Sequence, residues 1–293
     1  MPVNNRLSKT LQRTLAIAAL LVLAGCAAVP DEERLLVLQA DGQVGVRNQP
    51  CGKPRPAVAG PAAAGRGALD PQKLRILNWN LHKGEDKGWQ ADLGRFAAEH
   101  DVLLIQEAVL NDPERQVLEA AGHAWQMVGA FAFRGTERGV LTAARAAVLD
   151  SCTTRTFEPV TYLPKTALVV RYALSGQDKT VAIANLHGIN FSLGLGSFRE
   201  QLEGVAAELA RHDGPVVLGG DFNTWSNDRH AALGQIAGRL GLVAVQVTPD
   251  GRRRTFGLHL DHLWVRGFKV LSAQAPEVKS SDHNPILVTL SLN

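Results

Sequence analysis

From Lys73 onward the chain alternates short apolar runs with stretches of helical spacing, and this alternation limits the folds open to it. The runs are rich in β-branched residues, as expected of buried strands. Apolar spacing predicts helices near Trp89 and near Leu202, the second starting at a capping box of Ser197 and Glu200. Strands outnumber helices, which argues against a simple doubly wound fold. Strands are predicted at residues 74–78, 102–105, 139–142, 165–171, 181–184, 216–218, 263–265 and 286–290.

The predicted strand at residues 216–218 leads into the sequence Asp-Phe-Asn-Thr at residues 221–224. Two glycines between them let the backbone turn where the strand ends. A carboxylate and an amide two residues apart, Asp221 and Asn223, are therefore expected to face the same cleft. Neither a Gly-x-Gly-x-x-Gly fingerprint nor a phosphate-binding loop follows any of the predicted strands.

Polar side chains stand at the ends of other predicted strands as well. A single glutamate there is usually a solvated cap, and a single histidine is usually a core residue with satisfied hydrogen bonds. Their recurrence favours one cleft, because buried polar groups are costly unless they share a network or a function. The positions are Asn78, Asn80, Gln106, Glu107, Asn185, His187, Asp261, His262, Asp282 and His283.

In this order the motifs resemble the endonuclease/exonuclease/phosphatase superfamily, which includes DNase I, exonuclease III type repair endonucleases, neutral sphingomyelinases and inositol polyphosphate 5-phosphatases. The resemblance covers residues 73–293. Within the superfamily, the chain is similar in detail to the bacterial YafD-like branch. It implies a DNase I-like four-layer α/β/β/α sandwich, with two mixed sheets flanked by helices and the active site at one end. The narrower resemblance rests on Lys165-Thr-Ala-Leu, Asn185-x-His187-x-x-Asn190-Phe-Ser-Leu-Gly, Asp221-Phe-Asn-x-Trp225-Ser, Arg252-Arg253-Arg254-x-Phe256-Gly and Ser281-Asp-His-Asn-Pro.

The resemblance also implies a divalent metal ion. Oxygen ligands suit a hard cation, so Asn80 and Glu107 are expected to bind Mg²⁺, or Mn²⁺ in its place, and Asp282 completes the metal or water network. Zinc is the alternative, but the chain lacks the paired cysteines that would favour it. Some repair endonucleases carry an acid two residues after the Asn80 position, where this chain has His82. One metal ion or two therefore remain open.

Hydrolysis of a phosphodiester requires in-line attack by a positioned water and neutralisation of charge on the phosphate oxygens. The resemblance implies that Asp221 orients or deprotonates this water and that Asn223 holds a phosphate oxygen. His283, positioned by Asp261, would contact the phosphate as an imidazolium, since a neighbouring carboxylate favours the charged form. His187 would assist the leaving group as a general acid.

Substrate recognition is less constrained by the sequence. Arg252, Arg253 and Arg254, together with Asn190, are candidates for binding a substrate phosphate. A solvated turn explains the arginine run equally well. The apolar, glycine-rich segment 191–198 is a lid, a base-stacking loop or a membrane-facing loop, or it simply packs against the domain, which is the plainest interpretation.

The first 25 residues resemble a bacterial lipoprotein signal. A basic start precedes an apolar core at residues 15–23 that is short for a transmembrane helix, and a lipobox ends at Cys26. Lipid on Cys26 would place the protein in the bacterial cell envelope, anchored on the periplasmic side, and Ala27 favours the outer membrane. An ordinary secretory signal and a short amino-terminal anchor are the alternatives.

Residues 26–72 contain many prolines and glycines and are predicted to be a tether, with a possible hairpin at residues 35–46. In an oxidising compartment Cys51 and Cys152 either form one disulfide or remain two separate thiols. If they pair, the bridge closes a loop of about a hundred residues and pins this segment to the catalytic domain at residues 73–293.

The sequence thus favours a monomeric enzyme that hydrolyses a phosphodiester, most simply a nuclease. The alternatives are a lipid or small-molecule phosphoesterase, such as a sphingomyelinase-like enzyme, and a surface lipoprotein that only binds. A binding protein has no need for the full residue set, which argues against the last. Apart from three basic residues in the leader, 28 basic residues balance 28 acidic ones, so net charge does not favour nucleic acid.

Overall fold

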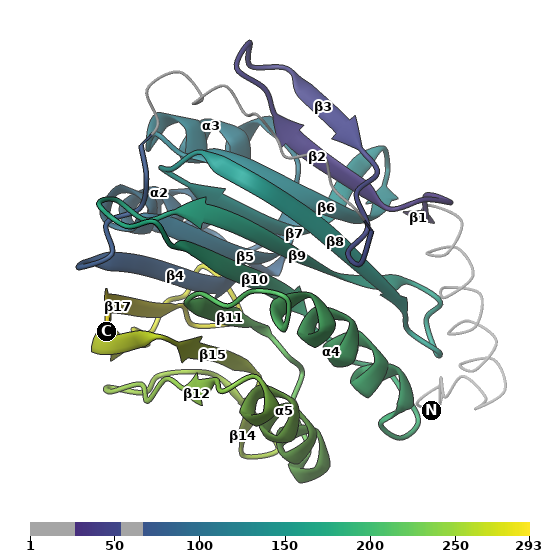
Figure 1. Ribbon diagram of the computed structural model, residues 1–293. Coiled ribbons are helices and arrows are strands. Elements are labelled where there is room, and N and C mark those ends of the chain that lie inside the picture. Colours follow the sequence, from purple (N-terminus) through teal and green to yellow (C-terminus); the bar gives the residue numbers. More distant parts are fainter. Residues whose placement is uncertain (1–26, 54–66) are drawn as a thin grey trace, which may run out of the picture.

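The computed structural model describes residues 27–53 and 67–293, which form two sheets packed face to face (Figure 1). The larger sheet has nine strands and the smaller has six, and both combine parallel with antiparallel pairs. In spatial order the larger sheet contains β16 (Phe268–Gln274), β17 (Ile286–Leu292), β4 (Leu74–Asn80), β5 (Val102–Val109), β7 (Thr136–Ala144), β6 (Ala124–Phe133), β2 (Arg34–Leu38) and β3 (Val44–Arg47), with β1 (Ala27–Ala28) beside β6. The smaller contains β12 (Val243–Ala244), β15 (Asp261–Arg266), β11 (Val216–Asp221), β10 (Thr180–His187), β9 (Pro164–Ala173) and β8 (Val148–Phe157).

Four α-helices are present in the described part of the chain, two on each outer face. They are α2 (Trp89–Glu99), α3 (Asp112–Ala120), α4 (Gly196–Leu209) and α5 (Asn227–Arg239). Phe96 of α2 packs in one cluster with Leu103 of the larger sheet. Leu202 of α4 and Leu233 of α5 pack with Leu186 of the smaller sheet. The structure therefore confirms the four-layer α/β/β/α sandwich.

Successive residues of a central strand point alternately to the opposite sheet and to the helices that cover the outer face. In β11, Val217 joins the apolar cluster between the sheets, whereas Val216 and Leu218 join the cluster beneath α4 and α5. Because both faces of such a strand are covered, its sequence is apolar throughout rather than alternating. This explains why the central strands were visible in the sequence as short continuous runs.

All eight predicted strands are confirmed, although each is longer than its apolar run. The longer strands β6, β8 and β16, all the two-residue strands, and helices α3 and α5 were not predicted. The capping box was wrong: α4 begins at Gly196, and no side chain caps its amino terminus. Ser197 lies inside the first turn instead. Serine does cap α5, where Ser226 accepts a hydrogen bond from the backbone of Arg229.

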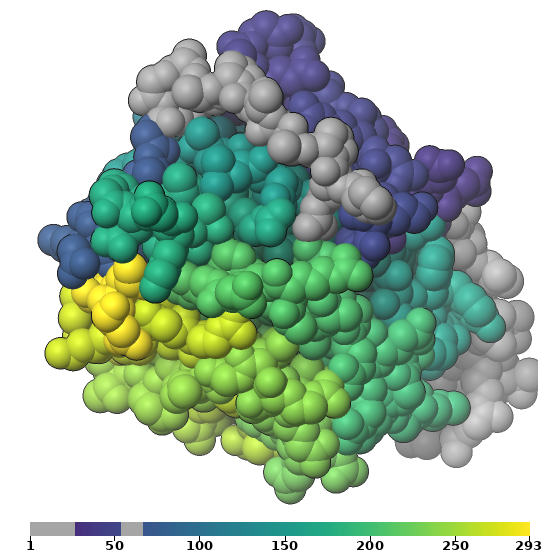
Figure 2. All heavy atoms as spheres, viewed as in Figure 1, coloured from purple at the N-terminus to yellow at the C-terminus, as the bar shows by residue number. Residues whose placement is uncertain are grey.

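The predicted hairpin is confirmed, and it belongs to the larger sheet. β2 and β3 pair with each other, and β2 also pairs with β6, with Leu35 opposite Val128. The hairpin stands at the upper edge of the molecular surface (Figure 2). Cys51 and Cys152 form a disulfide across 101 positions of sequence. The described part of the predicted tether is thus joined to the domain by strand pairing and by a covalent bridge.

The predicted signal segment and Cys26 lie outside the described residues. Within the described residues, no helix is both long enough and apolar enough to cross a membrane.

Candidate active site

The carboxyl ends of several central strands converge at one end of the sandwich. In the smaller sheet, β10 and β11 align His187 with Asp221, and β11 and β15 align Asp221 with Asp261. In the larger sheet, Asn80 is the last residue of β4, and Glu107 lies on the neighbouring strand β5. The sheets meet directly here, because Asn80 Nδ2 donates to Asp221 Oδ2 over 3.0 Å.

Beneath these groups a layer of buried amides joins the two sheets. Gln106 Nε2 donates to Asn185 Oδ1 over 2.7 Å and to Asn78 Oδ1 over 3.1 Å. Asn185 Nδ2 donates in turn to the Leu141 carbonyl over 2.9 Å. Gln106, Asn78 and Asn185 are almost fully buried. These predicted cleft residues therefore support the floor of the site and do not face a substrate.

A tight turn after β11 positions Asp221 and Asn223. Asp221 Oδ1 accepts the Asn223 backbone N–H over 2.9 Å, and Asn223 has a left-handed backbone with φ of 51°. The adjacent strand end approaches so closely that a Cβ on Gly188 would lie 2.5 Å from the Phe222 carbonyl oxygen. Asn223 Nδ2 donates to the Gly188 carbonyl over 3.0 Å, which locks the two strand ends together.

His283 is held by Asp261, as predicted. Its Nδ1 lies 2.7 Å from Asp261 Oδ2, and its Nε2 lies 3.9 Å from Asp221 Oδ2. Burial lowers the pKa of His283, but the charge and hydrogen bond of Asp261, together with the Asp221 and Asp282 carboxylates, outweigh burial and raise the pKa to about 10. The imidazole is therefore cationic at neutral pH. Asp261 Oδ1 is buried and has no hydrogen-bond partner among the described residues.

Glu107 owes its position to a bulge in β5. Pairing with β7 shifts between Ile105 and Ala108, and Glu107 adopts a left-handed φ of 52°. Its Oε2 pairs with Lys83 Nζ at 2.7 Å. Burial raises the pKa of Glu107, but the nearby His187, Lys83 and Lys165 side chains have the larger combined effect and lower the pKa to about 2.

His187 contacts a buried lysine. Lys165 Nζ lies 2.9 Å from His187 Nε2, and the same Nε2 lies 3.7 Å from Asp221 Oδ2 and 3.9 Å from Glu107 Oε1. Burial and the Lys165 ammonium lower the pKa of His187 to about 4. The imidazole is therefore neutral at pH 7, and its Nε2 accepts a hydrogen bond from Lys165 Nζ.

Sequence reasoning did not assign a role to Lys165 or Lys83. Lys165 had a signal, since a lysine near the start of an otherwise apolar strand calls for a partner in the interior. Lys83 had none. It lies in the short 3₁₀ turn η2 (His82–Gly84), whose φ of 59° at Lys83 no sequence pattern indicates.

Asp282 lies apart from this cluster. Its side chain is 57% exposed, and its Oδ2 lies 3.9 Å from His82 Nε2, while His82 Nδ1 lies 2.6 Å from Asp86. His262 is buried, with its Nε2 2.7 Å from Thr224 Oγ1. The same nitrogen lies 3.2 Å from the His259 carbonyl oxygen, so the imidazole belongs to a buried hydrogen-bond network.

The predicted phosphate-binding residues are divided. Arg252 donates to Asp250 through Nε and Nη2 and to the Asp261 carbonyl through Nη1 over 3.0 Å, so its guanidinium supports the active-site strand. Arg253 and Arg254 are exposed, the latter on the hairpin of β13 (Arg254–Thr255) and β14 (Leu258–His259). Asn190 accepts a hydrogen bond from Trp225 Nε1 over 3.1 Å.

The residues present fit a hard divalent cation. The Glu107 carboxylate is ionised at neutral pH and offers oxygen atoms to a cation, and its Oε1 lies 3.5 Å from the Asn80 amide nitrogen. The Asn80 amide oxygen accepts the His82 backbone N–H over 3.0 Å and, as a carbonyl, has a second lone pair. A second group, formed by Asp221, Asp261 and His283, brings its ligand atoms within 4.8 Å of one another.

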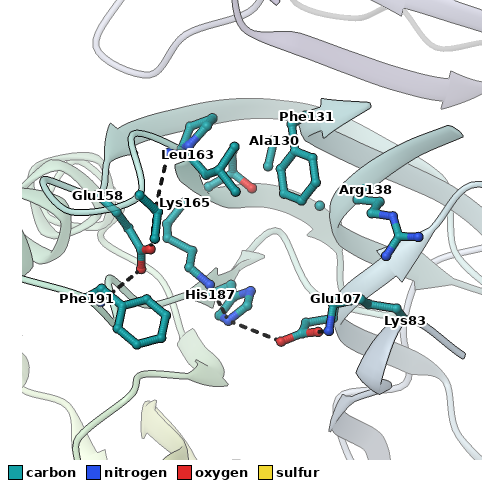
Figure 3. A pocket seen from close by; sticks show the side chains of 14 residues that line it. Lys83, Glu107, Ala130, Phe131, Arg138, Glu158, Leu163, Lys165, His187 and Phe191 are labelled. Carbon is teal, nitrogen blue, oxygen red and sulfur yellow. Dashed lines mark hydrogen bonds and ion pairs between the residues drawn. The ribbon is translucent and has the colours of Figure 1, made fainter. Parts of the chain in front are cut away.

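A cavity of about 200 Å³ opens beside the charged groups (Figure 3). Lys165 and His187 extend into the centre of the view, with Glu107 and Lys83 to one side. Lys83, Glu107, Lys165 and His187 line one part of the cavity. The facing wall is apolar and is formed by Ala130, Phe131, Leu163, Pro164 and Phe191.

A DNase I-like sandwich whose strand ends carry this set of acids, amides and histidines defines a class of hydrolases that includes nucleases and phosphatases. The chain belongs to the Endonuclease/Exonuclease/phosphatase family, which it matches over residues 77–283. It is 38% identical to a UPF0294 protein of Vibrio parahaemolyticus over 232 residues, covering 78% of this chain and 82% of that one.

Solved structures agree with this fold. The catalytic domain of human Nocturnin with bound sulfate is 17% identical, with a TM-score of 0.60, over 77% of this chain and 96% of that one. A mannosyl-6-phosphatase of Bacteroides thetaiotaomicron is also 17% identical, with a TM-score of 0.59, over 75% of this chain and 100% of that one. At this identity the likeness concerns the fold alone.

Proposed function

We propose that the protein is a divalent-metal-dependent phosphodiesterase, and specifically a nuclease. The observation that carries the proposal is the convergence of Asn80, Glu107, His187, Asp221 and the His283–Asp261 pair at one end of the sandwich, with contacts between the two sheets. Glu107 and His187 also line the cavity beside this cluster. Carboxylates that activate water and cations that stabilise a phosphate are the two requirements of phosphodiester hydrolysis.

Each group has a role that its contacts support. Asp221 Oδ2 stands between Asn80, His187 and His283, where it orients or deprotonates the attacking water. His283 is kept cationic by Asp261 and stabilises negative charge on the phosphate. Asn223, fixed by the turn after β11, holds a phosphate oxygen.

The leaving group is assisted by the contact between His187 and Lys165. Because His187 is neutral at pH 7 in the free protein, Lys165 supplies the proton of this pair. Burial lowers the pKa of Lys165, which makes its ammonium a stronger acid toward the leaving group. This modifies the role predicted from the sequence, in which His187 alone was the acid.

Mg²⁺ or Mn²⁺ would be held by Glu107 and Asn80 and would polarise the phosphate oxygens when bound. Asp282 is too exposed to be confined to one position, so we propose that it contributes through water. Lys83, which pairs with Glu107 Oε2, leaves Oε1 facing Asn80.

A lipid phosphoesterase is the second candidate. Phe191 and Leu193 follow His187 on one loop and are 54% and 94% exposed, and Tyr162 on the neighbouring β8–β9 loop is 76% exposed. Exposed apolar side chains beside a reaction centre suit a membrane surface.

The envelope location is part of the proposal. The Cys51–Cys152 disulfide supports an oxidising compartment, and the lipobox supports a lipid anchor at Cys26 on the periplasmic side.

A substrate panel tests the proposal. The purified protein is assayed on single- and double-stranded DNA, RNA, a choline phosphodiester and phosphomonoesters, with Mg²⁺, Mn²⁺ or EDTA. We expect metal-dependent cleavage of nucleic acid. Preference for the choline diester would favour the lipid enzyme, and no turnover of any ester would favour a binding protein.

A further inference from the structure

The cavity of Figure 3, called here the side pocket, has a composition that the phosphodiester reaction does not require. One end is formed by Glu107, His187 and Lys165, which belong to the reaction centre. The other end is apolar. A substrate phosphate at the reaction centre would therefore place one of its two ester arms in the side pocket.

A bulge in β6 builds the aromatic part of the wall. Pairing with β7 shifts between Gly129 and Phe131, so that two consecutive residues, Ala130 and Phe131, both line the side pocket. In a regular strand these side chains would point to opposite faces. Phe191 lines the pocket from the β10–α4 loop, and with 54% exposure much of its ring is open to contact.

The side pocket also contains buried polar atoms without partners. Thr166 is only 1% exposed, and its Oγ1 makes no hydrogen bond within the described part of the chain. Arg138 Nε is also buried and makes no hydrogen bond to the described residues. The Arg138 guanidinium lies over the Phe133 ring, 5.0 Å from its centroid, and its Nη1 makes a distant ion pair with Glu85 at 3.8 Å. Thr166 and Arg138 both line the pocket. Buried polar atoms normally have partners, so this wall is built to be completed by hydrogen bonds from a ligand.

We propose that the side pocket binds one nucleobase of the substrate, adjacent to the scissile phosphate. This inference rests on the proposed nuclease function and deepens it. A base has a flat apolar face for Phe131 and Phe191 and polar edges for Thr166 and Arg138. A cavity of about 200 Å³ accepts a single ring system, whereas two long acyl chains would extend far beyond it.

The test compares substrates that differ by one base. Three dinucleoside monophosphates are assayed: one with both bases, and two in which one nucleoside is replaced by an abasic analogue. Removal of one particular base is expected to lower kcat/KM about 10- to 100-fold, as loss of a stacked base does elsewhere. Removal of the other base has a smaller effect. Inhibition by a nucleoside monophosphate, compared with the corresponding sugar phosphate, measures the same preference by binding.

Two variants assign the effect to the pocket. Phe131→Ala removes aromatic surface, and Thr166→Val removes the hydroxyl while keeping the shape. Each is expected to reduce the preference for the base-containing substrate at least threefold, with turnover of the abasic substrate retained as the internal check of folding. Phe256→Ala is the matched control, since Phe256 is 85% exposed and lies outside the pocket.

The outcomes separate this inference from the proposed function. Equal turnover of all three dinucleotides, or an unchanged preference in both variants, overturns the base site and leaves the nuclease intact. Preference for a choline diester over every dinucleotide overturns the base site in favour of a lipid. Absence of turnover of any phosphodiester overturns the proposed function, and the inference with it.

Discussion

Two buried histidines in the site are held in opposite charge states by their neighbours. His283 has a carboxylate at 2.7 Å and a pKa of about 10, whereas His187 has an ammonium at 2.9 Å and a pKa of about 4. The pair therefore supplies one permanent cation and one neutral imidazole within reach of Asp221. Groups with separated pKa values are typical of acid–base chemistry.

Replacing Asp261 tests the first of these assignments. In Asp261→Asn, His283 loses the carboxylate that keeps it charged, and kcat is expected to fall about 100-fold or more. The NMR titration of His283 is expected to move to lower pH. Asp178→Asn is the matched control, because Asp178 is exposed and lies on the loop between β9 and β10. Equal losses in the two variants would contradict the role given to Asp261.

At the scale of elements, the loop between β10 and α4 is fixed from two sides. Glu158 Oε1 accepts the backbone N–H groups of Asn190, over 2.6 Å, and Phe191, over 3.2 Å. From α5, the buried Arg229 guanidinium donates to the carbonyls of Asn190 and Asn223, both over 3.0 Å. Helix α5 thereby connects the β10–α4 loop to the turn that positions Asn223.

Arg229→Lys tests this connection. Lysine keeps the charge but cannot donate to several carbonyls in the fixed arrangement of a guanidinium. We expect a loss of about 2 to 4 kcal/mol in the free energy of unfolding by urea, with a lower kcat at temperatures where the variant is folded. Arg239→Lys, at an exposed position of the same helix, should change neither. Unchanged stability of Arg229→Lys would show that the guanidinium does not hold the loop.

Helix α3 carries a buried acid with a predictable effect on stability. Glu114 Oε2 accepts the Val109 backbone N–H, and burial raises the pKa of Glu114 from 4.5 to about 8. The native state therefore binds a proton that the unfolded chain releases between pH 4.5 and 8. Stability should fall with rising pH across this window, by at most about 1.4 kcal/mol per pH unit from this group.

The measurement compares the urea unfolding of the wild type and of Glu114→Gln from about pH 5 to about pH 9, a range that includes the raised pKa of Glu114. Glutamine keeps the accepting oxygen and removes the proton. The variant should gain stability relative to the wild type as the pH rises. Parallel pH profiles would exclude the raised pKa.

The sequence predicted the central elements better than the peripheral ones, for a physical reason. Central strands such as β11 are apolar on both faces and stand out as continuous runs. β16 was missed because one face is open to solvent, with Lys269 and Leu271 exposed, and its pattern resembles a loop. α5 was missed because its apolar face consists largely of small residues, such as Ala232 and Ala237.

Site residues at the ends of strands were predicted from the sequence. Site residues in irregular backbone were missed. Asp221 and His187 align through strand register, which follows from neighbouring apolar runs. Lys83 reaches Glu107 only because a left-handed turn and a bulge bring them together. Such local conformations depend on packing from other strands, and one segment of sequence does not contain that information.

At the scale of the whole molecule, the Cys51–Cys152 bridge joins the segment that follows the amino-terminal hairpin to β8. It closes a loop with a sequence separation of 101 residues, for which the chain-entropy model gives a stabilisation of about 4 to 5 kcal/mol. The double variant Cys51→Ser/Cys152→Ser is expected to unfold at correspondingly lower urea. Equal midpoints for the oxidised wild type and the variant would show that the bridge is dispensable.

The whole account depends on hydrolysis of a phosphodiester at Asp221. The most direct measurement is kcat/KM of the wild type and of Asp221→Asn on the best phosphodiester substrate, with Mg²⁺ and with EDTA. Asp228→Asn, an exposed acid on α5, serves as the control. We expect Mg²⁺-dependent turnover that falls about 1,000-fold in Asp221→Asn and is unchanged in Asp228→Asn. Turnover that survives both EDTA and the Asp221 substitution would contradict the mechanism.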